Sequence, residues 1–197
     1  GYALGPILEQ TMPSQIEKAL AQADKRYWKL MEEITALRRR LPRQAVADHE
    51  FIAATGKKTN LLQLFGKHKH LILVHHMGPQ CPYCSLWADG YSGQTEYIAQ
   101  KAAFAVAAPK PHKALAEATK KHGWKFPFVS DEDGRFAKLM GFWSKPGDKW
   151  EGPLPGVSVF ERNGKKIERV SRDFFGPGDV YCPAFHFFDL LPANAKA

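Results

Sequence analysis

The sequence predicts an α/β sandwich, a mixed sheet with helices on both faces, with a long N-terminal helical extension. Three observations support this. Strand-like apolar runs alternate with helix-like segments through the middle of the chain, an Asn163-Gly164 turn signals a late hairpin, and a heptad-spaced helix comes first. Alternating strands and helices are typical of a sheet covered on both faces.

The first predicted element is a helix that begins after Ser14. Ser14 and Glu17 match a capping box, while Arg38–Arg40 and Pro42 mark the end. Apolar residues between them recur at heptad intervals, namely Ile16, Leu20, Ala23, Tyr27, Leu30, Ile34, Leu37 and Leu41. Such a helix is about 40 Å long, so its seam must be covered by its own domain or by a twin. We favour a homodimer through this helix.

We therefore divide the chain into residues 1–42, a loose lead-in plus this helix, and residues 43–197, an α/β domain. Strands are expected at 51–54, 70–75, 103–108, 126–129, 157–160 and 165–171. Helical segments are expected at 60–66, from 82 onward, at 111–122, at 136–142 and at 180–191. Gly90 and Gly93 should bend or break the second of these helices.

The chemistry centres on Cys81-Pro82-Tyr83-Cys84, which follows the apolar run 71–74 and a short loop. Strand, loop and Cys-x-x-Cys at a helix start are typical of a thioredoxin-like redox site. Unpaired amides and the helix dipole stabilise a thiolate there and lower the pKa of such a thiol from about 8.5 to roughly 3.5–7.5. We expect Cys81 to be the exposed attacking thiol and Cys84, one turn inside, to resolve the resulting mixed disulfide.

The chain resembles the thioredoxin-like family of predicted dithiol-disulfide oxidoreductases, a domain of unknown function in the peroxiredoxin-like branch. The resemblance covers nearly the whole chain. It rests on Leu41-Pro42, Leu64-Phe65-Gly66, residues 81–90, Gly123-Trp124-Lys125-Phe126-Pro127, residues 154–160, His186 and Asp189-Leu190. It implies a thioredoxin-like three-layer sandwich with Cys81 and Cys84 as the redox pair.

Thioredoxins also suggest partners for the cysteine pair. Their hairpin proline is cis and faces the cysteines, a position that Pro155 matches, and Leu154 would present its backbone to substrate. The alternative is an ordinary turn proline. His75, six residues before Cys81, matches a buried acid that assists proton transfer, or is simply a hydrogen-bonded core histidine.

The Pro82-Tyr83 pair is similar to that of glutaredoxins, and we place both residues at the substrate. No glycine pair followed by aspartate marks a glutathione site, so glutathione stays an open question.

Two later residues are weaker candidates. Cys182 and His186 are four residues apart on a predicted helix and could complete a Cys3His zinc set with Cys81 and Cys84. Cys182 could instead be a third redox thiol, but a small buried side chain is the simpler interpretation. We expect no bound cofactor or metal.

Composition restricts the function classes. A net charge of +8 comes from scattered basic residues without a nucleic-acid motif, and no apolar run is long enough for a membrane span. Three cysteines do not form a structural disulfide framework, which favours a reducing compartment such as the cytoplasm.

The leading prediction is a thiol-disulfide oxidoreductase acting on protein disulfides or small thiols, with an unidentified electron donor. One alternative is a thiol peroxidase, although the Pro-x-x-x-Thr-x-x-Cys pattern of peroxiredoxins precedes neither cysteine. A redox-silent adaptor that binds zinc or copper is the alternative from another class; His68, His70, His75 and His76 keep it open.

Overall fold

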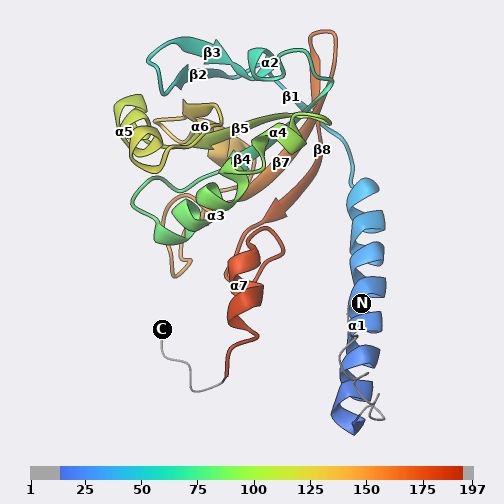
Figure 1. Ribbon diagram of the computed structural model, residues 1–197. Helices are drawn as coiled ribbons and strands as arrows, with labels where there is room; N and C mark the ends of the chain where they lie inside the picture. The colour runs from blue at the N-terminus through green and yellow to red at the C-terminus, as the bar shows by residue number, and fades with distance from the viewer. Residues whose placement is uncertain (1–13, 193–197) are drawn as a thin grey trace, which may run out of the picture. The chain divides into compact units, whose positions relative to one another are not determined.

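The computed structural model describes residues 14–192, so the predicted lead-in, residues 1–13, lies outside them. The chain divides after Leu41 into two units, which we describe separately. Figure 1 labels the elements of both. Within the described residues, no helix is long and apolar enough to cross a membrane.

The first unit is helix α1, Gln15–Arg39. The Ser14 hydroxyl accepts a hydrogen bond from the Glu17 N–H at 3.2 Å, and the Glu17 carboxylate accepts one from the Ser14 N–H at 2.6 Å. This capping box satisfies amides that the first helical turn leaves unpaired, and it confirms the predicted start. Basic side chains in the last turn suit the helix dipole.

The second unit is built on one sheet. Within the described residues, eight strands form it in the order β1-β8-β7-β4-β5-β6-β2-β3. Their bounds are β1 Gln44–Val46, β2 Glu50–Ala53, β3 Lys58–Asn60, β4 His70–His75, β5 Ala103–Ala108, β6 Phe128–Ser130, β7 Gly156–Asn163 and β8 Lys166–Phe174. The pairs β4/β5 and β5/β6 are parallel and the others antiparallel, so the sheet is mixed, as predicted.

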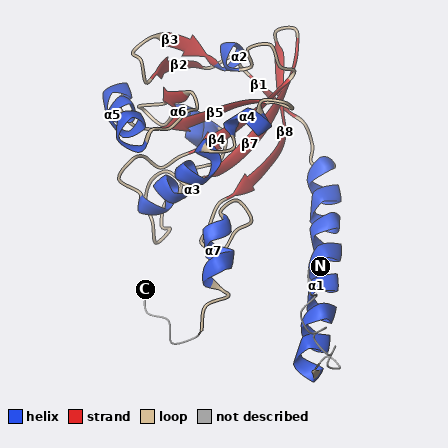
Figure 2. Cartoon of the chain, in the orientation of Figure 1, coloured by secondary structure: helices blue, strands red, loops and turns tan. Residues whose placement is uncertain are grey.

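Helices cover both faces of this sheet (Figure 2). Their bounds are α2 Leu61–Leu64, α3 Pro82–Ser92, α4 Thr95–Ile98, α5 His112–His122, α6 Arg135–Leu139 and α7 Pro183–Phe188. One core lies between the sheet and helices α3, α5 and α7, and the other between the sheet and helices α2 and α6. The second unit is therefore a three-layer sandwich.

Strand β4 lies between β5 and β7 at the centre of the sheet, and it leads directly to the cysteines. Leu71 and Leu73 belong to the core beneath α2 and α6, whereas Val74 belongs to the core beneath α3. Because both faces are covered, the strand's interior, Leu71–Val74, is continuously apolar instead of alternating.

Some elements differ from the sequence prediction. Strands β1 and β3 were not predicted, because each is a three-residue edge strand with too few buried positions to show a period. The last helix is shorter than residues 180–191: Pro183 starts it, and Asp179 folds the preceding segment into a turn by binding the N–H groups of Gly176 and Tyr181. The break at Gly93 is confirmed, but helix α3 continues through Gly90 without a break.

The heptad seam of α1 stays a predicted dimer interface. Within the described chain none of the residues of this helix is buried, and Ile16 is 81% exposed. We propose that a second copy covers the seam, because residues of both signs, Glu17, Asp24, Arg26 and Glu33, flank it and can pair across it.

Sedimentation equilibrium tests this dimer. The native chain should sediment as a dimer and Leu30→Asp as a monomer, because a carboxylate in the seam would be buried without a partner. Lys29→Asp, a neighbouring substitution outside the seam, should remain dimeric. A native chain that stays monomeric at all concentrations would contradict the proposal.

Candidate active site

Cys81 is the N-cap of helix α3. Its Sγ accepts a hydrogen bond from the Cys84 N–H at 3.3 Å, and Pro82 occupies the first turn, where the helix needs no amide donor. The Cys84 N–H and the positive end of the helix dipole are therefore directed at the sulfur.

The two thiols of the motif differ in exposure. Cys81 is partly exposed, and its sulfur lies 3.9 Å from the Met77 sulfur. Cys84 is 2% exposed, and burial raises the pKa of its thiol well above the ordinary value, although a backbone hydrogen bond from Met77 acts in the opposite direction. Cys81 can meet an external electrophile, while Cys84 stays protonated one turn inside.

The two histidines at the end of β4 lie on opposite faces of the sheet. His75 stacks on Phe142, with 4.0 Å between ring centroids, and its Nε2 hydrogen-bonds the Ser158 hydroxyl at 2.9 Å. Phe142 belongs to the core beneath α2 and α6, whereas Cys84 belongs to the other core. Proton transfer between His75 and the cysteines therefore has no geometric support, and the alternative of a hydrogen-bonded core histidine fits.

His76 is the histidine on the cysteine side. Its Nδ1 accepts a hydrogen bond from the Gly78 N–H at 2.9 Å, so the neutral ring carries its proton on Nε2. That Nε2 is buried and has no hydrogen-bond partner among residues 14–192. Its ring lies against Trp124 and Phe128, and burial lowers its pKa to about 4.

Pro155 reaches the cysteine region in an unexpected conformation. Every peptide bond of the described chain is trans, so the predicted cis bond between Leu154 and Pro155 is wrong. Pro155 still lines the same groove as Cys81. The Leu154 N–H donates to the Phe142 carbonyl at 2.9 Å and is not free to pair with a substrate strand. A Cβ at Gly156 would collide with the Phe142 ring, which explains a glycine at this close approach.

Cys182 and His186 do not join the cysteine pair in a ligand set. Cys182 is 2% exposed and packs in the same core as Cys84 and Trp87, which confirms the interpretation as a small buried side chain. His186 is exposed, and its Nε2 lies 3.0 Å from the Asp179 carbonyl. Among the described residues, no group of three or more His, Cys, Asp or Glu side chains is placed to hold a metal ion.

A groove of about 450 Å³ opens beside Cys81. The predicted substrate residues Pro82 and Tyr83 line it, together with Met77 and Trp87. Later segments also line it, with Trp150 and Phe175 as their aromatic members. Both lie in or beside loops rich in proline and glycine, and the sequence gives no spacing that would connect them to the cysteines.

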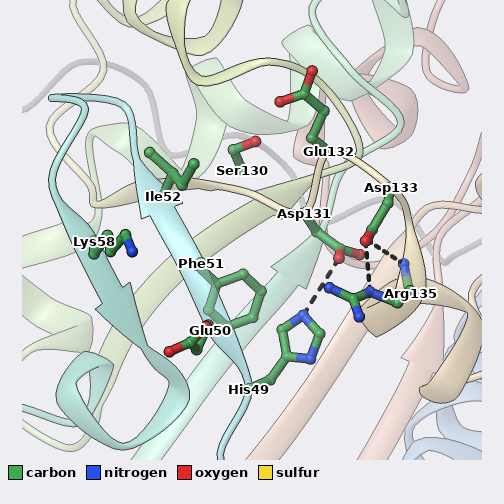
Figure 3. A pocket seen from close by; sticks show the side chains of 10 residues that line it. All are labelled: His49, Glu50, Phe51, Ile52, Lys58, Ser130, Asp131, Glu132, Asp133 and Arg135. Carbon is green, nitrogen blue, oxygen red and sulfur yellow. Dashed lines mark hydrogen bonds and ion pairs between the residues drawn. The ribbon is translucent and has the colours of Figure 1, made fainter.

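A second cavity, of about 460 Å³, is shown in Figure 3. It is lined by β2, β3 and the start of α6, and none of the cysteines contributes to it. Two pairs of its side chains interact locally. His49 lies 3.5 Å from Asp131, whose carboxylate accepts hydrogen bonds from the Phe136 and Ala137 N–H groups, and Arg135 pairs with Asp133. These four side chains therefore have structural partners within the protein.

Residues 5–194 match the model of a family described as "Bacterial protein of unknown function (DUF899)". The chain belongs to this family. Because the match spans most of its length, the cysteine motif, the groove and both cores are parts of a DUF899 protein. No curated protein matches this sequence.

Solved peroxiredoxins share the fold of this DUF899 protein. Peroxidoxin BcpB from Mycobacterium tuberculosis is 18% identical with a TM-score of 0.57, over 66% of this chain and 83% of that one. Peroxiredoxin Q from Xanthomonas campestris is 14% identical with a TM-score of 0.57, over 74% and 98%. PrxQ from Xylella fastidiosa is 17% identical with a TM-score of 0.56, over 72% and 87%. The domain is thus a thioredoxin-like sandwich of the peroxiredoxin type, as predicted.

The two buried histidines should make folding sensitive to acid. Burial lowers the pKa of His75 to about 3 and that of His76 to about 4, whereas an unfolded chain protonates histidine near 6.5. The stability that the two neutral histidines contribute should therefore be fully present above pH 6.5. It should fall as the pH drops towards 4, by about 1.4 kcal/mol per pH unit for each histidine.

Urea unfolding at pH 7.5, 6, 5 and 4.5 measures this dependence. His75→Phe combined with Ser158→Ala keeps a stacked ring and removes its buried polar partner, so about half of the slope should disappear. If the free energy of unfolding of the native-sequence protein is constant from pH 6.5 to 5, the assignment of both rings as neutral is contradicted.

Proposed function

We propose that this protein is a thiol-based oxidoreductase in which Cys81 attacks an oxidised substrate and Cys84 resolves the product. The observation that carries the proposal is the Cys81 sulfur, which caps helix α3 at the mouth of a groove while a buried thiol lies one turn inside. This arrangement provides a nucleophile at the surface and a second thiol to displace what it captures.

A hydroperoxide is the first substrate class, and the likeness of the fold to peroxiredoxins supports it. The Cys81 thiolate would attack the terminal oxygen, the O–O bond would break, and the alcohol would leave with a proton. The resulting Cys81 sulfenic acid would then be attacked by Cys84, which forms an S–S bond and releases water. An external dithiol would reduce that disulfide and close the cycle.

Disulfide exchange is the second candidate, and the Cys-Pro-Tyr-Cys motif at a helix N-terminus supports it. Cys81 would attack one sulfur of a protein or small-molecule disulfide and expel the other as a thiolate. Cys84 would then attack the Cys81 sulfur, form the Cys81–Cys84 disulfide and release the second half of the substrate as a thiol that carries the Cys84 proton. An external dithiol would reduce the Cys81–Cys84 disulfide and close the cycle. The missing Pro-x-x-x-Thr-x-x-Cys pattern weighs in favour of this reaction and against a typical peroxidase site.

Cysteine variants test the shared mechanism. Cys81→Ser should lose turnover with every substrate, at least about a thousandfold, because the nucleophile is gone. Without an added reductant, Cys84→Ser should complete one attack and then stop, leaving Cys81 as a sulfenic acid or a mixed disulfide that mass spectrometry can detect. Cys182→Ala is the matched control and should retain the native rate.

Two assays with dithiothreitol as reductant separate the substrate classes. Hydrogen peroxide and tert-butyl hydroperoxide report peroxidase activity by their consumption, and insulin reports disulfide reduction by precipitation. Peroxide turnover that requires Cys81 would select the first reaction, and insulin turnover that requires Cys81 the second. Dithiothreitol can itself reduce a Cys81 sulfenic acid, so Cys84→Ser can keep peroxide turnover in this assay. Equal rates for the native chain and Cys81→Ser in both assays would exclude the proposed function.

A further inference from the structure

We infer that the groove beside Cys81 selects uncharged substrates with an apolar arm and disfavours charged ones. This inference rests on the proposed function. The shared chemistry is an alkyl or aryl group attached to the oxidised bond. Such a group belongs to an organic hydroperoxide in one reaction and to a dialkyl disulfide in the other. Glutathione disulfide, with its carboxylates and ammonium groups, belongs to the disfavoured class.

The first argument is the charge of the lining. Lys, Arg, Asp and Glu make up 24% of the chain, yet none of them lines this groove, and no histidine does. The side chains that line the groove together with Cys81 are, apart from Gln80, mostly aromatic, prolyl and thioether groups, among them Trp87, Trp150 and Phe175. A charged ligand would lose hydration here without meeting a counter-ion.

The second argument is that four N–H hydrogens of the wall already have partners. The Trp87 indole N–H donates to the Asp179 carboxylate at 3.2 Å, and the Trp150 indole N–H donates to the Pro153 carbonyl at 3.2 Å. One N–H of the Gln80 amide donates to the Met77 carbonyl at 3.1 Å, and the Gly176 N–H donates to Asp179 at 2.9 Å. These four hydrogens are therefore not available to a carboxylate of the substrate.

The third argument is that aromatic surface at the groove is exposed to water. Tyr83 is 51% exposed and Trp150 is 55% exposed, both at the groove, although aromatic side chains gain most from burial. A volume of about 450 Å³ lies in the range of small-molecule sites, roughly 300–1,000 Å³. An apolar arm placed between Tyr83 and Trp150 would remove this surface from water.

A homologous series measures the predicted selectivity. Ethyl, butyl and hexyl hydroperoxides should show kcat/KM rising by up to about fourfold per added methylene, which corresponds to about 0.8 kcal/mol per buried CH₂. Methyl 6-hydroperoxyhexanoate should react at least tenfold faster than 6-hydroperoxyhexanoate, which has the same chain with a carboxylate. For disulfide exchange, dipropyl disulfide should likewise react faster than glutathione disulfide.

Variants of the wall locate the effect. Trp150→Arg should flatten the chain-length dependence and favour the carboxylate substrate, because it replaces an apolar wall by a cation. Trp28→Arg makes the same change on α1, at a side chain that is 66% exposed and does not line the groove, and it should leave the selectivity unchanged.

Ligand binding to the Cys81→Ser variant tests this inference separately from the proposed function. Tryptophan fluorescence should report tighter binding of 1-hexanol than of hexanoate, because Trp87 and Trp150 line the groove. Turnover without any dependence on chain length or charge would overturn the inference alone. Selective hexanol binding without turnover of any substrate would overturn the proposed function and support the selectivity of the groove.

Discussion

The hydrogen bond from the Cys84 amide to the Cys81 sulfur depends on the positions of the central strand of the sheet and of the turn that follows it. Strand β4 is fixed by partners on both sides and by a core on each face. The turn after it passes through Gly78 at a φ of 121°, where a Cβ would collide with Gln80 and Lys110. The same Gly78 donates its N–H to His76, so the turn that positions Cys81 is anchored to the strand before it.

The sheet separates side chains with a structural role from those beside the cysteine pair. The face beneath α2 and α6 holds His75, which the core keeps neutral and stacked on phenylalanine rings. The face beneath α3 holds Cys84, Trp87 and the second histidine, His76. Side chains of adjacent residues along a strand therefore lie in different surroundings, because alternate side chains point to opposite faces of the sheet.

Much of the fold could be predicted from local patterns. The capping box at Ser14 and Glu17, the Asn163-Gly164 turn and the uninterrupted apolar run of β4 each correspond to an interaction made by near neighbours in sequence or by a fully covered strand. The position of Cys81 at a helix start was predicted for the same reason. Such signals are short-range, so the amino-acid sequence displays them directly.

The rest of the site depends on contacts between distant segments. Trp150 precedes and Phe175 follows the hairpin β7–β8, yet both line the groove with Cys81, and nothing in their spacing indicates this. His75 was matched to the cysteines by its distance along the chain, but packing against Phe142 sets the face on which it lies. The bond before Pro155 was expected to be cis by comparison with thioredoxins, and the structure has it trans.

The central claim is that Cys81 and Cys84 act together as one redox pair. The most direct measurement is peptide mapping of the reduced protein after treatment with one equivalent of an organic hydroperoxide or a small disulfide. The account predicts a disulfide between Cys81 and Cys84, with Cys182 still a free thiol. Oxidation of Cys182 instead, or a Cys81 that remains fully reduced under both oxidants, would contradict it.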